Sequence, residues 1–188
     1  MADNANVRAW GQGVVYVAPV GTTGPTDVTT PLGASWDDLG ELEQDAGADL
    51  TISEDTTDVY AWGKGLARRI KSKHKREIKV VVLETNAVVL GLVNPGSAAT
   101  NDGTITTYVV KQPTADPRAF VIHEVDGDVI RRRIIKRAEV SAVGEAIKDG
   151  ETGVTQWPLT IAIYPDASTS EIWTEITNDP AYLDLASA

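Results

Sequence analysis

The chain has two histidines, His74 and His123, and no cysteine. Zinc hydrolases bind their metal through patterns such as H-x-x-x-H or H-E-x-x-H, and neither pattern occurs here. The absence of cysteine excludes disulfides, thiolate metal sites and cysteine nucleophiles. Because His123 falls in a segment that predicts a β-strand, we expect it to be packed or at the rim of the fold rather than a ligand.

Other catalytic patterns are missing as well. Asp126-Gly127-Asp128 supplies two nearby carboxylates, which are too few for a calcium site and fit a tight turn instead. The chain has neither a glycine-rich phosphate loop nor a G-x-S-x-G nucleophile elbow. We therefore expect no enzymatic activity, no metal and no cofactor.

Two basic runs, residues 68–76 and Arg131-Arg132-Arg133, raise the question of nucleic-acid binding. Basic side chains can neutralise phosphates, but no stacking aromatic residues are interleaved with either run, and Trp62 is the nearest one. Both runs fall in predicted strands, and the formal net charge is −10. This pattern favours a solvated or partner-facing strand surface over a nucleic-acid site.

The charge is divided sharply along the chain. Residues 1–60 hold eleven carboxylates and one base, whereas residues 61–80 hold eight bases and one carboxylate. The two sections either neutralise each other within one subunit or pair between subunits, and the sequence leaves both alternatives open.

The most apolar stretch, residues 77–96, is central to the expected core. Its first part, residues 78–83, is β-branched and predicts a strand. Thr85 or Asn86 could cap a short helix that ends before Asn94-Pro95-Gly96, although one long buried strand is a competing interpretation. No stretch approaches the roughly 20 apolar residues that span a membrane, and the first residues do not resemble a signal peptide.

The remaining pattern predicts a mainly β protein, a β-sandwich or barrel with one short flanking α-helix. Residues 66–83 predict one very long strand that bends or projects, with most of its lysines on one face. A hairpin is expected around Asp126-Gly127-Asp128, with further pairing as far as Lys148. The other predicted strands span residues 13–18, 49–54, 104–111, 157–163 and 171–177, and residues 97–103 predict a polar loop. We expect a single domain over residues 1–188, with a long loop at about 20–60 and flexible termini.

Several segments, taken in order, resemble the major tail tube proteins of long-tailed siphophages, especially those that infect actinobacteria. They span residues 14–166 and comprise residues 15–22, 25–27, 36–40, 83–86, 118–122, the hairpin with its arginine-rich second strand, and residues 158–166. The resemblance implies a tail-tube-like β-sandwich that assembles as hexameric rings stacked into a tube.

The resemblance also implies partners and a location. The tube would contact the tape measure, tail tip and terminator proteins, and DNA would pass through its lumen without specific binding during ejection. The protein would be assembled in the host cytoplasm, reside in the virion tail and lack both a membrane partner and an additional immunoglobulin-like domain. The alternatives are another virion β-protein, such as a tail terminator or head–tail joining protein, or a nucleic-acid-binding β-domain.

Charge complementarity then suggests where subunits meet. We expect the acidic section of one subunit to face the basic strand of a neighbour, because complementary patches set register and orientation. The candidate interface residues are Asp37, Asp38, Asp45, Asp49, Glu54, Asp55, Asp58, Arg68, Arg69, Lys71, Lys73, Lys75 and Lys79.

Overall fold

The computed structural model describes residues 6–145 and 153–187. In order, the elements are β1 (Gln12–Pro19), β2 (Asp37–Asp38), β3 (Asp49–Ala61), β4 (Gly65–Val82), α1 (Ala87–Val93), β5 (Ala98–Asn101), β6 (Thr106–Val109), β7 (Arg118–Asp126), β8 (Val129–Val143), β9 (Trp157–Ile163), β10 (Thr174–Thr177) and the 3-10 helix η2 (Pro180–Ser187). The expected pairing toward Lys148 reaches residues 146–148, outside the described residues. The expectation of flexible termini likewise falls partly on residues 1–5 and 188, which the structure does not describe.

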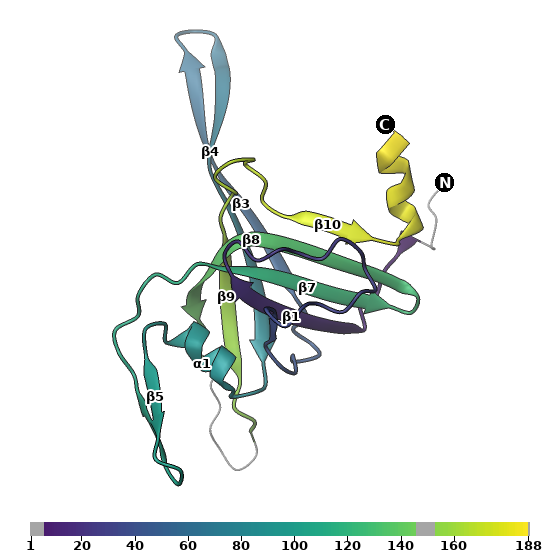
Figure 1. Ribbon diagram of the computed structural model, residues 1–188. Helices are drawn as coiled ribbons and strands as arrows, with labels where there is room; N and C mark the ends of the chain where they lie inside the picture. The colour runs from purple at the N-terminus through teal and green to yellow at the C-terminus, as the bar shows by residue number, and fades with distance from the viewer. Residues whose placement is uncertain (1–5, 146–152, 188) are drawn as a thin grey trace.

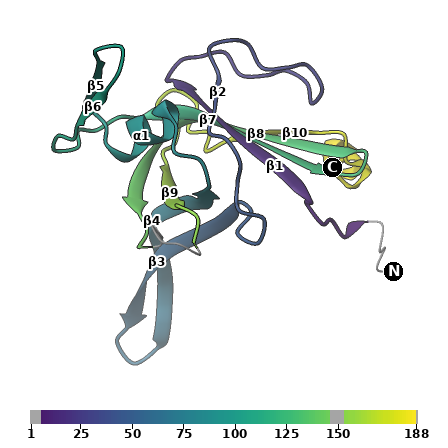
Figure 2. The same ribbon diagram turned by 90° about the horizontal axis from the view of Figure 1, so that it is seen from below.

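One large antiparallel sheet dominates the fold, as the mainly β prediction requires. Its strand order is β2-β1-β7-β8-β9-β4-β3, and β10 pairs with β8 off this path. The first half of β8 pairs with β10, whereas its second half pairs with β9. This change of partner lets the sheet fold over, so that β1 and β7 cross the direction of β4 and β9 (Figures 1 and 2).

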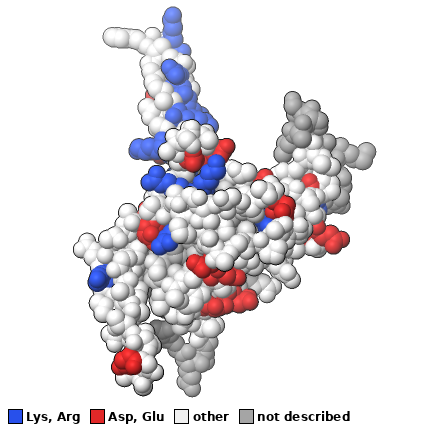
Figure 3. Space-filling view, in the orientation of Figure 1, with Lys and Arg blue, Asp and Glu red and all other residues white. Residues whose placement is uncertain are grey.

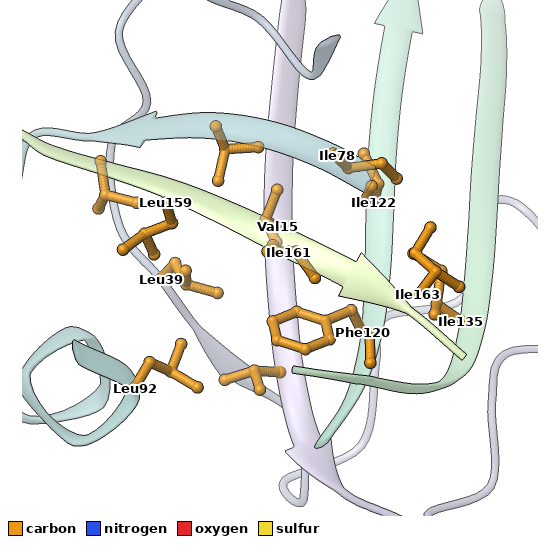
Figure 4. Packing of buried hydrophobic residues seen from close by; sticks show 14 of the residues in the cluster. Val15, Leu39, Ile78, Leu92, Phe120, Ile122, Ile135, Leu159, Ile161 and Ile163 are labelled. Carbon is orange, nitrogen blue, oxygen red and sulfur yellow. The ribbon is translucent and has the colours of Figure 1, made fainter. Parts of the chain in front are cut away.

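The main core lies between the two halves of the folded sheet (Figure 4). Alternate residues of each strand point inward because side chains along a strand alternate between its two faces. The strand predicted for residues 157–163 is confirmed as β9, whose Leu159, Ile161 and Ile163 are buried in this core with Trp157 packed against them. They meet Phe120 of β7 and the buried residues of β1, β4 and α1, including Val15, Ile78, Val80 and Leu92.

A second, smaller cluster lies on the other face of β1, β7 and β8. Trp36 folds back onto Val121 and Ile134, and its indole Nε1 donates a hydrogen bond to the Thr23 carbonyl at 3.2 Å. The expected long loop therefore covers this outer face. It runs to Ala48, interrupted by the two-residue strand β2, and the chain from Asp49 onward is strand β3.

The sheet does not close into a barrel, so β2 and β3 remain as its edges. The segment 37–43 crosses between the two sides. Leu39 N–H donates to the Val15 carbonyl of β1 at 3.0 Å, and Glu43 N–H donates to the Val81 carbonyl of β4 at 2.8 Å. The open side of the fold is therefore spanned by a strongly acidic segment rather than by a strand.

The helix interpretation of residues 86–93 is confirmed by α1. The Asn86 side chain accepts a hydrogen bond from Val89 N–H at 2.9 Å and also donates one to the Leu39 carbonyl at 3.0 Å. A cap of this kind satisfies an otherwise unpaired amide of the first helical turn. Thr85 has a different role, because its hydroxyl accepts a hydrogen bond from the Trp157 indole.

The predicted hairpin around Asp126-Gly127-Asp128 is also confirmed, as β7 pairs with β8 from Asp126 and Val129 onward. Gly127 adopts a φ of 59°, a left-handed conformation that glycine reaches without a steric penalty. The polar loop predicted for residues 97–103 is wrong in part, because Ala98–Asn101 forms β5 and pairs with β6. The helix η2 follows the last strand and was not predicted.

Candidate subunit interface

Strands β3 and β4 form a hairpin that continues far beyond the body of the protein, and we call its projecting part, residues 53–75, the arm (Figure 1). The long strand predicted for residues 66–83 is confirmed, and it projects rather than bends back. Ile78 is the last buried residue of β4 toward the arm. At a rise of about 3.3 Å per residue, the tip lies about 40 Å beyond Ile78.

The tip is a tight turn of glycine and aromatic residues. Lys64 N–H donates to the Ala61 carbonyl at 3.1 Å, and Ala61 pairs directly with Gly65. Gly63 takes a φ of 70° within this turn, which a residue with a side chain adopts only at a cost. The Trp62 side chain is left at the outer end of the arm, fully exposed.

A bulge at the base of the arm changes the predicted arrangement of lysines. Ser53 pairs with Lys75 but Asp55 pairs with Ser72, so Lys73 and His74 together oppose one residue of β3. Lys73 has a φ of 50°, as expected of an extra residue inserted into a strand. The prediction is wrong for Lys71, because the bulge shifts the alternation and turns this residue to the face opposite Lys75.

Ion pairs join the acidic and basic strands within the same chain. Asp58 receives two hydrogen bonds from Arg69, at 2.7 and 3.0 Å, and Glu54 lies 2.9 Å from both Lys71 Nζ and His74 Nδ1. Hydrogen bonds from Lys71 and His74 hold the pKa of Glu54 below its ordinary value, and the bond from Arg69 does the same to the pKa of Asp58. Part of the charge is therefore neutralised internally.

The other candidate residues lie on the arm, at its base and, in β2 and the segment after it, away from the arm. Lys73 pairs with Asp55 at 2.9 Å, and Lys75 pairs with Glu77 on its own strand at 2.8 Å. Asp49 lies opposite Lys79 at the base of the arm. The remaining four are exposed and make no ion pair within the part of the chain that the structure describes: Asp37 and Asp38 on β2, Asp45 in the following segment, and Arg68 near the tip.

The exposed apolar residues on the arm were not predicted from the sequence. Tyr60, Trp62 and Leu66 surround the tip, and Val59 and Ile70 lie next to them. Isolated exposed apolar residues are ordinary, but a contiguous group of them marks an interaction surface. Their position on both sides of the Gly63-Lys64-Gly65 turn, next to a basic run, was the available signal.

The arginine triplet has a structural role, which corrects its expected place on a solvated or partner-facing surface. Arg131 donates to Glu124 at 2.8 Å, while the buried Arg133 donates to Glu175 at 3.3 Å. Arg132 donates to the backbone carbonyls of Asp27 and Thr30 and so holds the long loop against the sheet. These guanidinium groups are occupied within the fold and are not available as a phosphate-binding patch.

His123 is half-buried, as expected, and its ring Nδ1 lies 3.1 Å from Nε of Arg132. Burial lowers its pKa, and the neighbouring Arg132 charge adds to that effect. Within residues 6–145 and 153–187, no group of three or more His, Asp or Glu side chains is placed to hold a metal ion. Among the described helices, none is long and apolar enough to cross a membrane.

The fold and the arm define a mainly β protein with an exposed, charged and aromatic projection. The sequence matches the family model described as "Phage tail tube protein" over residues 1–186, and the chain belongs to that family. No individually curated protein matches the chain at a significant level. Membership makes the protein a structural component of the virion tail.

Proposed function

We propose that this protein forms the tail tube by assembling into hexameric rings that stack on one another and enclose a conduit for DNA ejection. Each chain would act as a single tail-tube domain. The arm is the observation that carries the proposal. It projects about 40 Å from the core, and its apolar residues remain largely exposed in their own chain.

The asymmetry of the molecule supports head-to-tail assembly. The arm leaves the body at one end only, so a contact between the arm of one subunit and the body of another joins two different surfaces (Figure 3). Such a heterologous contact repeats until it closes as a ring or continues as a filament. We propose that the resulting tube is that of a long-tailed siphophage, assembled in the host cytoplasm.

The thirteen charged candidate residues have two different roles in this proposal. The ion pairs inside the arm stiffen it, whereas the exposed charges that remain on the arm and on residues 37–45 contribute to contacts between subunits. A single exposed ion pair contributes only about 0–1 kcal/mol, so the effect depends on many charges repeated around each ring. Such contacts weaken as salt screens the charges.

We also propose that DNA passes through the lumen without specific binding, beside the tape measure protein. A net charge of −10 is compatible with a mainly acidic wall, which would repel phosphates rather than hold them. The tail tip and terminator proteins would contact the two ends of the tube. An assembled structure with a lumen dominated by lysine and arginine would contradict this part of the proposal.

Negative-stain electron microscopy of purified protein at high concentration, with and without the tail initiator complex, tests the proposed function. We expect long tubes of uniform diameter in at least one of these conditions. A strictly monomeric sedimentation profile in both conditions and across salt concentrations would argue decisively against it.

A further inference from the structure

The arm tip combines positive charge with exposed apolar surface. Residues 59–73 hold five basic side chains and no carboxylate. Trp62 has a relative exposure of 103%, so its indole contacts nothing in its own chain. Truncation of a buried tryptophan or arginine is among the most costly changes at protein interfaces, and both residue types occur here at the end of a projection.

A cavity of 630 Å³ on the open side of the fold has the complementary character. It lies between the start of β1 and the segment that leads into β3. Its apolar lining includes Val14, Leu42 and Ile122, and its acidic lining includes Glu41, Glu43 and Asp45. Residues 37–49 hold six carboxylates and no base, and these three acidic side chains make no ion pair within the described parts of the chain.

We infer that the arm tip of one subunit docks into this acidic cavity of the next subunit. Trp62 covers the apolar lining, and Lys64 and Arg68 face the carboxylates. The inference rests on the proposed function, because it names the receiving surface for the self-association proposed above. The expected contact between the acidic section of one subunit and the basic strand of a neighbour is kept in this inference. It is limited to the charged residues that make no ion pair within their own chain.

The contact has to be intermolecular. Residues 41–48 immediately precede β3, and the tip lies at the opposite end of that strand. The 13 residues of β3 place the two surfaces about 40 Å apart in one molecule. Since the tip and the cavity are different surfaces, each subunit can insert its own arm into one neighbour and bind the arm of another neighbour. Repetition of this contact generates a ring or a continuing stack.

The charge of this cavity differs from that of a second large cavity. A cavity of 650 Å³ beneath the loop at residues 20–24 is more apolar, but Lys136 and Arg137 lie along it together with Asp166. A basic tip entering it would meet like charges, which disfavours that partner surface. Docking of the tip there is therefore the competing outcome of the test.

Crosslinking between two single-cysteine variants tests the inference, because the natural sequence contains no other thiol. Lys64→Cys places a thiol at the tip and Asp45→Cys places one at the acidic cavity, and both positions are exposed. The two variants are mixed under assembly conditions and treated with a short bis-maleimide. The matched control replaces Asp45→Cys with Val20→Cys, an exposed residue beside the competing cavity.

We expect a covalent dimer from Lys64→Cys mixed with Asp45→Cys, and none from either variant alone or from the mixture with Val20→Cys. Tubes that form without the expected dimer, or with the Val20→Cys dimer instead, would overturn the docking site and leave the proposed function intact. Absence of any self-association, with the initiator complex supplied, would overturn both.

A second measurement tests the contribution of Trp62 to assembly without a crosslinker. Trp62→Ala should raise the critical concentration for assembly at least about 10-fold, as expected for truncation of a hot-spot residue. Thr57→Ala, on the same arm, should change it less than about 2-fold. Both variants should keep the parent's circular dichroism and urea midpoint as monomers. Equal critical concentrations for Trp62→Ala and the parent would overturn the role of Trp62.

Discussion

The same substitution at two isoleucines of strand β4 distinguishes the contribution of the arm from that of the core. Ile78 is fully buried between the halves of the folded sheet, whereas Ile70 lies on the arm with 42% of its surface exposed. We expect Ile78→Ala to destabilise the monomer strongly and Ile70→Ala to affect mainly assembly. Both variants remove the same atoms from the same strand, so each serves as the control for the other.

The magnitudes follow from burial. Truncation of a buried isoleucine to alanine costs about 2–5 kcal/mol, which includes the cavity left behind. At Ile70 the monomer should lose less than about 1 kcal/mol, because no closed cavity forms there. If assembly buries the exposed part of Ile70, the three lost carbons at about 0.8 kcal/mol each, scaled by that exposed fraction, contribute about 1 kcal/mol. This corresponds to a critical concentration about 5-fold higher.

Urea unfolding at a dilution that keeps the protein monomeric, followed by light scattering during assembly, measures both quantities. The expected pattern is a large fall in urea midpoint for Ile78→Ala only, and a higher critical concentration for Ile70→Ala with a midpoint close to the parent's. Equal loss of monomer stability in the two variants would show that the arm is part of the core's cooperative unit and would refute the reasoning.

Three further predictions concern the arm, the termini and the helix. Lys71→Glu should lower the free energy of local opening of the arm, measured by amide exchange, by less than about 1 kcal/mol. Adding Glu54→Lys should restore that free energy, and a failure to restore it would mean that the ion pair does not stabilise the arm. Hydrogen bonds from Arg8 and from Ala181 N–H lower the pKa of Asp179 to about 2. Its stabilisation should therefore be complete above about pH 4 and lost as the pH falls toward 2, so Asp179→Asn should flatten this acid limb of the urea midpoint. Asn86→Ala should cost the monomer about 1 kcal/mol in urea, and an unchanged midpoint would contradict the capping role.

Local patterns were enough to predict the strands that form the core. Alternation places Leu159, Ile161 and Ile163 on one face whatever their partners are, and Asp126-Gly127-Asp128 encodes its own turn. The Asn86 cap is likewise local, because its side-chain oxygen accepts a hydrogen bond from an amide only three residues away. These elements depend on contacts within a few residues, which a sequence displays directly.

Features that depend on distant partners were not predictable in the same way. The bulge at Lys73 exists only relative to β3, so strict alternation assigned Lys71 to the wrong face. Arg131 and Arg133 look like a solvated basic patch until Glu124 and Glu175 are brought beside them by β7 and β10. Composition alone could not decide whether charges pair within or between subunits, since neither the partner strand nor its register is written in the charge count.

The most direct test of the tail-tube assignment is a helical reconstruction of assembled tubes by electron cryomicroscopy. We predict six subunits in each ring, with arm residues 59–73 in contact with a neighbouring subunit and Trp62 removed from solvent. Tubes in which every arm extends freely into solvent, or ordered assemblies that are not tubes, would contradict it.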